Sequence, residues 1–119
     1  MKLYHSFTFE AAHRLPKTPP THRCHRMHGH SYRVVLGLEG RVDPESGFVA
    51  DFFEIEENFS PLLAELDHHC LNEIEGLENP TAENIAVWIW QRAKPALPQL
   101  TVVTVYETPD CWAEYDGRG

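Results

Sequence analysis

The sequence contains no apolar run that approaches the ~18 residues a membrane-spanning helix needs. It also lacks an excess of basic residues: the formal net charge is −8, which argues against a nucleic-acid binder held by a broad basic surface. The N-terminus lacks the continuous apolar segment of a secretory signal, because polar residues interrupt positions 1–6. We therefore expect a cytoplasmic protein that binds neither nucleic acid nor membrane.

Cysteine is scarce. The chain has an odd number of cysteines, and they are widely spaced: Cys24, Cys70 and Cys111. Both features argue against a disulfide framework. Cys70 and Cys111 have no basic neighbours, so we expect both to be inert thiols of the core. Cys24 lies among basic residues and is considered below.

The length and composition fit one globular domain. A chain of 119 residues lies in the usual range for a single domain, and its apolar share of 42% and charged share of 24% are ordinary. No internal repeat or low-complexity tract divides the sequence. We therefore expect residues 1–119 to form a single domain.

Basic charge is concentrated in one segment. Residues 13–33 carry five of the ten basic residues and five of the eight histidines, and they contain no acidic residue. For an arbitrary cluster of this kind, a solvated basic loop is the simpler explanation. The alternative is a pocket for a small polyanion, which the histidines within the segment favour.

Two strands are predicted by alternation with a period of two. In residues 2–13 the odd positions are mostly apolar and the series ends at His13. In residues 28–39 the even positions begin with His28 and His30 and continue with apolar residues. Prolines between the two strands predict a long loop over residues 14–27.

Helices are expected in two places. Asp51 resembles the first residue of a capping box, and apolar residues at helical spacing continue to about Leu66, with Pro61 as an expected kink. Thr81 is the expected cap of a second helix, which Pro95 closes.

The end of the chain predicts a hairpin. Strands are expected over residues 101–107 and 111–115, separated by a Thr-Pro-Asp turn. Residues 48–51 are expected to form a short strand or an extended lead into the first helix. Together these elements predict an α+β protein with four main strands.

Three histidines have the spacing of metal ligands. A His-x-His pair on one strand points both imidazoles to the same face, with Cα atoms about 6.5–7 Å apart, which suits two ligands of one ion. His28 and His30 form such a pair, and His13 ends the neighbouring strand. Each histidine alone is more simply explained as a hydrogen-bonded or solvent-facing residue. Three nitrogen donors together are typical of an open, catalytic zinc site.

Cys24 leaves two interpretations open. It lies four residues before His28, so it is a possible fourth ligand that would close the site and make it structural. Its neighbours Arg23, His25 and Arg26 instead favour the thiolate, which suits a nucleophile or a general base.

Two further carboxylates are candidates for function. Asp67 precedes His68, and such a carboxylate can orient an imidazole for proton transfer, although helix capping or a surface ion pair explains the same pair. Glu107 ends an otherwise apolar strand, where it is either solvated or the acceptor for a ligand with paired N–H donors.

Several short motifs follow one another along the chain: Phe9-Glu10-Ala11-Ala12-His13-Arg14, Cys24-x-x-x-His28-Gly29-His30, Asp67-His68-His69, Pro80-Thr81-Ala82-Glu83-Asn84 and Tyr106-Glu107-Thr108. With these motifs in this order, the chain resembles the 6-pyruvoyl-tetrahydropterin synthase family over nearly its whole length. The three-residue gap between Cys24 and His28 is most similar to the bacterial 6-carboxy-tetrahydropterin synthase branch. Leu66-Asp67-His68-His69 and Glu78-Asn79-Pro80-Thr81 are similar to the same branch. That branch serves queuosine and other 7-deazapurine pathways.

The resemblance implies a T-fold, in which two helices cover one face of an antiparallel four-stranded sheet. Subunits of this fold join their sheets into barrels, so a homo-hexamer built as a dimer of trimers is expected.

The resemblance also implies roles for individual residues. The implied zinc ligands are His13, His28 and His30. The implied catalytic residues are Cys24 as general base, with Asp67 and His68 as its proton-relay partners. The implied substrate contacts are Glu107, as the anchor of the pterin ring, and Thr81 and Glu83.

The implied substrate is the small molecule 7,8-dihydroneopterin triphosphate. A zinc-dependent lyase of this kind forms 6-carboxy-5,6,7,8-tetrahydropterin and releases acetaldehyde and triphosphate, and the basic segment would meet the triphosphate. Two alternatives remain open: a 6-pyruvoyl product, and a non-catalytic zinc-binding or pterin-binding module.

Overall fold

The computed structural model describes all of residues 1–119. Its elements follow in the order β1 (Lys2–His13), η1 (Arg23–His25), β2 (His28–Glu39), α1 (Phe52–Leu66), β3 (His69–Cys70), η2 (Leu71–Glu73), α2 (Ala82–Ala93), β4 (Leu100–Thr108) and β5 (Cys111–Tyr115). Neither α1 nor α2 has the length and apolar character required to span a bilayer.

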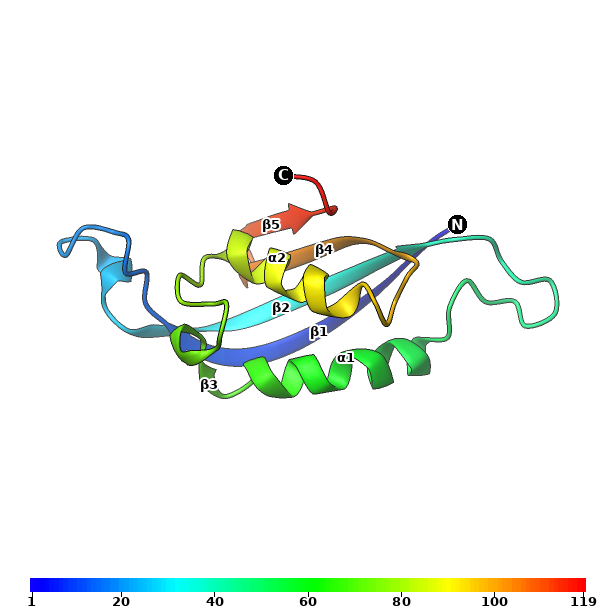
Figure 1. The fold of residues 1–119 in the computed structure, drawn as a ribbon, viewed down its shortest axis with the longest axis horizontal. Helices are drawn as coiled ribbons and strands as arrows, with labels where there is room; N and C mark the ends of the chain where they lie inside the picture. The colour runs from blue at the N-terminus through cyan, green and yellow to red at the C-terminus, as the bar shows by residue number, and fades with distance from the viewer.

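One mixed sheet holds the strands in the order β3-β1-β2-β4-β5, as Figure 1 shows. β1, β2, β4 and β5 pair antiparallel, whereas β3 pairs parallel with β1. The prediction of four antiparallel strands was therefore wrong: the sheet has a fifth strand, β3, which runs parallel to its neighbour. β3 is only two residues long, so it leaves no alternating pattern by which the sequence could reveal it.

The pairing of β1 with β2 determines which side chains share a face. Phe9 lies opposite Tyr32, and Ala11 lies opposite His30. Because directly opposed residues in an antiparallel pair point to the same face, the odd positions of β1 and the even positions of β2 form one continuous surface. Val105 of β4, opposite Val34, extends this surface to the next strand.

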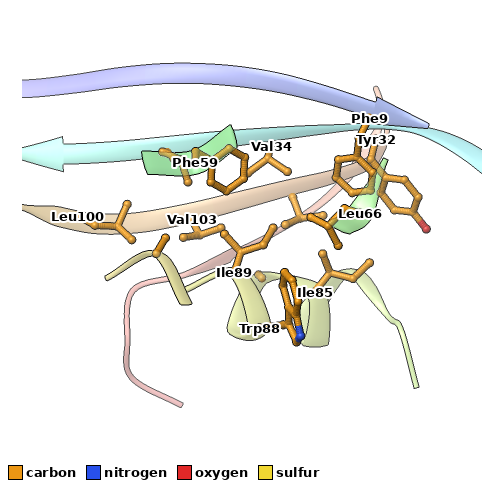
Figure 2. Packing of buried hydrophobic residues seen from close by; sticks show 14 of the residues in the cluster. Phe9, Tyr32, Val34, Phe59, Leu66, Ile85, Trp88, Ile89, Leu100 and Val103 are labelled. Carbon is orange, nitrogen blue, oxygen red and sulfur yellow. The ribbon is translucent and has the colours of Figure 1, made fainter. Parts of the chain in front are cut away.

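Both helices cover this apolar surface (Figure 1). Figure 2 shows the core between the sheet and the helices, with Ile85 and Ile89 of α2 facing Val103. From α1, the ring of Phe59 packs 4.7 Å from the ring of Phe7, centroid to centroid. The opposite face of the sheet carries mostly exposed residues, among them Tyr4.

The helix starts agree with the expected caps. Asp51 Oδ1 accepts a hydrogen bond from the N–H of Phe53 at 2.9 Å, and Thr81 Oγ1 accepts one from the N–H of Asn84 at 3.1 Å. α1 continues through Pro61 without interruption. Residues 48–51 form a bend and no strand before α1.

The cysteines do not lie in the core, contrary to expectation. Cys111 is exposed because it opens β5, the edge strand of the sheet, directly after a turn. Cys70 is half-buried in β3.

The long loop over residues 14–27 lies at one end of the elongated molecule, where β1 ends and β2 begins (Figure 1). The loop that leads from β2 to α1 lies at the other end. The fold thus gathers the histidine-rich, basic segment at a single end of the sheet.

Candidate metal centre and adjoining cavities

The paired ends of β1 and β2 bring three imidazoles together. His13 lies opposite His28, and His30 follows on the same face. The ring centroids are 4.6 Å apart for His13 and His28, 4.9 Å for His28 and His30, and 5.1 Å for His13 and His30. One ligand atom of each residue lies within 4.8 Å of those of the other two. The expectation that these side chains share a face is confirmed.

Backbone carbonyls determine how two of the rings are protonated. Nδ1 of His13 lies 2.9 Å from the carbonyl oxygen of Pro80, and Nδ1 of His28 lies 2.7 Å from that of Arg26. A carbonyl oxygen only accepts, so in both rings Nδ1 carries the proton and donates it. When such a ring is neutral, its Nε2 is therefore left with the lone pair.

The Nε2 atoms of His13, His28 and His30 are buried and have no hydrogen-bond partner. Leaving a buried polar atom unpaired costs roughly 1–3 kcal/mol, so three such atoms facing one another require an explanation. A bound metal ion supplies one, because each lone pair then becomes a ligand.

The electrostatic environment favours the form of histidine that binds metal. Burial lowers the pKa of His13, although its hydrogen bond to Pro80 and the nearby charge of Glu107 oppose the shift. Burial also lowers the pKa of His30, again against the effect of Glu107. Both rings are thus held neutral at pH 7, as metal ligation requires.

The donor set could hold a metal ion with one ligand position left open. The cluster consists of three histidines and includes neither a cysteine nor a carboxylate. Cys24 is therefore not placed as a fourth ligand, and the geometry does not support the closed, structural site. Three imidazoles with a free position match catalytic zinc.

Cys24 lies in η1, within the loop that follows β1. Its N–H donates to Nδ1 of His22 at 3.0 Å, and its carbonyl oxygen accepts from the N–H of Leu15 at 2.7 Å. These bonds hold the half-buried thiol close to the chain that leaves His13.

Asp67 and His68 form a pair after α1. Asp67 Oδ1 lies 3.0 Å from Nδ1 of His68 and accepts the N–H of Glu10 at 2.9 Å. The bond from Glu10 and the bond from His68 lower the pKa of Asp67. His68 has φ of 59°, an uncommon conformation for a residue other than glycine and one that is frequent at functional sites.

His68 lines a cavity of about 530 Å³, together with Glu10 and Ser31 on the side of the sheet opposite the helices. No hydrogen bond or ion pair joins this pair to Cys24 within the chain. Two of the three expected catalytic residues are thus paired, and the third, Cys24, lies in a different loop of the chain.

A second cavity, of about 620 Å³, gathers the expected substrate contacts. Thr81, Glu83 and Glu107 all line it, although they come from α2 and from β4. Cys111 and Trp112 of β5 complete one wall. Neither residue was expected at the site, since only the pairing of β5 with β4 brings them there.

Glu107 also lies beside the histidines. Its Oε1 is 3.6 Å from Nε2 of His30, and its Oε2 is 4.0 Å from Nε2 of His13. The second cavity and the candidate metal centre are thus adjacent and share this carboxylate.

Comparisons with known proteins agree with this arrangement. A family model described as 6-pyruvoyl tetrahydropterin synthase matches residues 2–118. A 6-carboxy-5,6,7,8-tetrahydropterin synthase of Synechocystis sp. is 40% identical over 119 aligned residues, which cover 95% of this chain and 91% of that protein. A dihydroneopterin monophosphate aldolase of Pyrococcus furiosus is 33% identical over 82% of this chain and 78% of its own. The solved structure of Caenorhabditis elegans 6-pyruvoyl tetrahydropterin synthase superposes with a TM-score of 0.92 at 30% identity, covering 99% of this chain and 96% of that one.

Proposed function

The chain belongs to the 6-pyruvoyl tetrahydropterin synthase family, and on that premise we propose that it is a zinc-dependent lyase acting on 7,8-dihydroneopterin triphosphate. The proposed products are 6-carboxy-5,6,7,8-tetrahydropterin, acetaldehyde and triphosphate, with one water consumed, as a step of queuosine or other 7-deazapurine synthesis. One observation carries the proposal: the buried Nε2 atoms of His13, His28 and His30 face one another without partners. The 40% identical relative supports the choice of product.

His13, His28 and His30 are proposed to hold the zinc ion. A bound zinc ion acidifies a hydroxyl group that it contacts and stabilises negative charge on oxygen. The proposed substrate suits this chemistry, because its side chain carries two adjacent hydroxyl groups and must lose carbon-bound protons.

Cys24 is proposed as the base that removes such a proton. A thiol can take up a proton once it is ionised, and Cys24 lies between Arg23 and the basic residues His25 and Arg26. Asp67 and His68 are proposed to return a proton, since a carboxylate 3.0 Å from an imidazole orients the ring for proton transfer.

A second subunit is proposed to complete each pocket. Cys24 and His68 are not joined within one chain, so Cys24 of one subunit would meet the Asp67–His68 pair of its neighbour. A homo-hexamer, formed as a dimer of trimers whose sheets join into barrels, would provide six such pockets.

The cavity lined by Thr81, Glu83 and Glu107 is proposed to receive the pterin ring. A carboxylate there can accept two hydrogen bonds from the 2-amino group and the adjacent ring N–H. The basic segment, residues 13–33, is proposed to meet the triphosphate, and residues 1–119 are proposed to act as a single domain.

Product analysis tests this proposal. Zinc-loaded protein is incubated with 7,8-dihydroneopterin triphosphate, with a Cys24→Ala chain as the inactive control, and the products are identified by mass. We expect the 6-carboxy product together with acetaldehyde. A product that keeps all three side-chain carbons would establish 6-pyruvoyl chemistry instead. No turnover by zinc-loaded protein would favour a binding module.

A further inference from the structure

Tyr32 lies at the point where the core meets the histidine cluster. Its side chain is fully buried and stacks on Phe9, with ring centroids 4.8 Å apart and an angle of 6° between the planes. In Figure 2 the two rings lie together at one end of the core, and the oxygen of Tyr32 points away from it. That oxygen lies 3.1 Å from Nδ1 of His13.

Nδ1 of His13 therefore has two oxygen neighbours, Tyr32 Oη at 3.1 Å and the carbonyl oxygen of Pro80 at 2.9 Å. Because the carbonyl cannot donate, the proton must lie on Nδ1 and be shared between the two oxygens. Moving this proton to Nε2 would leave the Nδ1 lone pair facing the lone pairs of Pro80. The Pro80 carbonyl thus selects the tautomer whose Nε2 lone pair faces the other histidines, and the Tyr32 hydroxyl group, which can donate or accept, adds a second contact that fixes the direction of the ring.

The ring of Tyr32 also contacts two of the three imidazoles. It meets His13 at 5.9 Å and 89°, and His30 at 5.5 Å and 80°, both edge to face. The side chain consequently limits the rotation of both rings while its hydroxyl group fixes one of them.

We propose that Tyr32 is a positioning residue of the metal centre, whose buried hydroxyl group fixes the orientation of the His13 ring while the Pro80 carbonyl sets its tautomer. This inference rests on the proposed function, because it takes His13, His28 and His30 as the metal ligands. Partners of this kind orient ligating histidines, and their loss typically weakens metal binding 10–100-fold. Since Pro80 remains in place, an effect near the lower end is expected for Tyr32.

The first test compares two matched substitutions. Tyr32→Phe removes the hydroxyl group and keeps the ring that stacks on Phe9. Tyr115→Phe is the control. Tyr115 lies in β5 and packs edge to face against Trp90 of α2, and its hydroxyl group makes no hydrogen bond. Zinc affinity is measured by competition with a chelator, and thermal unfolding of the metal-free chains shows whether each variant folds. We expect affinity to fall about tenfold in Tyr32→Phe and to stay unchanged in Tyr115→Phe.

The second test needs no metal. Nitrogen-15 NMR of the ring nitrogens in the metal-free chain should show His13 as the Nδ1–H tautomer in both the parent and Tyr32→Phe, and the Nδ1 resonance should shift in Tyr32→Phe because one of its two hydrogen-bond partners is lost. A merely structural role for Tyr32 would not change this signature in a variant that still folds.

The outcomes separate this inference from the proposed function. Zinc affinity within twofold of the parent and an unshifted His13 Nδ1 resonance in Tyr32→Phe, with zinc still lost in His28→Ala, would overturn the role of Tyr32 alone. A parent chain that binds no zinc would overturn the proposed function and the role of Tyr32 with it.

Discussion

Oε1 of Glu107 lies 3.6 Å from Nε2 of His30, so the carboxylate implied as the pterin anchor stands beside the candidate metal centre. A pterin held by its amino edge carries its side chain on the opposite edge of the bicyclic ring. Glu83, the other carboxylate implied as a substrate contact, lines the same cavity, as does Glu114.

Glu107→Gln and Glu83→Gln should distinguish the two carboxylates. Glutamine keeps the shape of the glutamate side chain, but its amide has one acceptor oxygen and an NH₂ group that would face the N–H donors of the pterin. Loss of the anchoring carboxylate should therefore raise KM roughly 10–100-fold. We expect Glu107→Gln to raise KM, to keep zinc, and also to lower kcat because the carboxylate borders the metal centre. Steady-state kinetics of both variants measures this. An unchanged KM in Glu107→Gln, with a raised KM in Glu83→Gln, would assign the anchor to Glu83.

Cys24→Ala should keep zinc and lose turnover. The thiol is proposed to move a proton and lies outside the histidine cluster, so its removal leaves the ligands intact. Metal analysis together with an activity assay tests the point, and Cys70→Ala serves as the control cysteine. Zinc well below one per chain in Cys24→Ala would restore the structural site that Cys24 closes.

Mixed oligomers should show whether two subunits build each pocket. Chains carrying Cys24→Ala or His68→Ala, each inactive alone, should regain part of their activity when refolded together, because roughly a quarter of the interfaces would hold both intact residues. Native mass spectrometry confirms that the oligomers are mixed. Mixed oligomers as inactive as either parent would show that a single chain builds the pocket.

The stability of the metal-free chain should fall with acidity between pH 7.5 and pH 5.5. Burial lowers the pKa of His13 and His30, so the unfolded chain takes up protons near pH 6.5 while the folded chain does so only at lower pH. Their stabilising contribution is complete above the unfolded pKa and is lost as the pH falls. The pKa of Asp67 is lowered from an already acidic value, so this residue changes the stability of the chain only at more acidic pH.

Urea unfolding at the two pH values measures this dependence. The slope for one fully responding histidine is about 1.4 kcal/mol per pH unit. His30→Asn should show a smaller difference in the free energy of unfolding than the parent. An equal difference in both chains would show that burial of this ring does not set the pH dependence.

The strands of the site were predictable because one face of each is buried. Alternation marked Lys2–His13 and His28–Glu39 to the residue, and it placed His28 and His30 on one face. The same alternation places Tyr32, two positions after His30, on that face, so this signal for its role was already in the sequence. β3 was missed since its pairing with β1 depends on contacts over a long sequence distance, such as that of Asp67 with Glu10.

The backbone partners of the histidines could not be predicted. The carbonyl groups of Pro80 and Arg26 reach the rings only through the paths of two loops, and every residue type carries a carbonyl. The exposure of Cys111 likewise depends on its position at the start of an edge strand.

The metal content of histidine variants tests the central claim most directly, which is that His13, His28 and His30 hold one zinc ion. His28→Ala and His30→Ala are purified beside the parent and beside His22→Ala, whose imidazole lies outside the cluster. Zinc per chain is then measured by atomic spectrometry. We expect about one zinc ion in the parent and in His22→Ala, and most of the metal lost in His28→Ala and His30→Ala. Full zinc retention by either of these two variants would contradict the three-histidine centre.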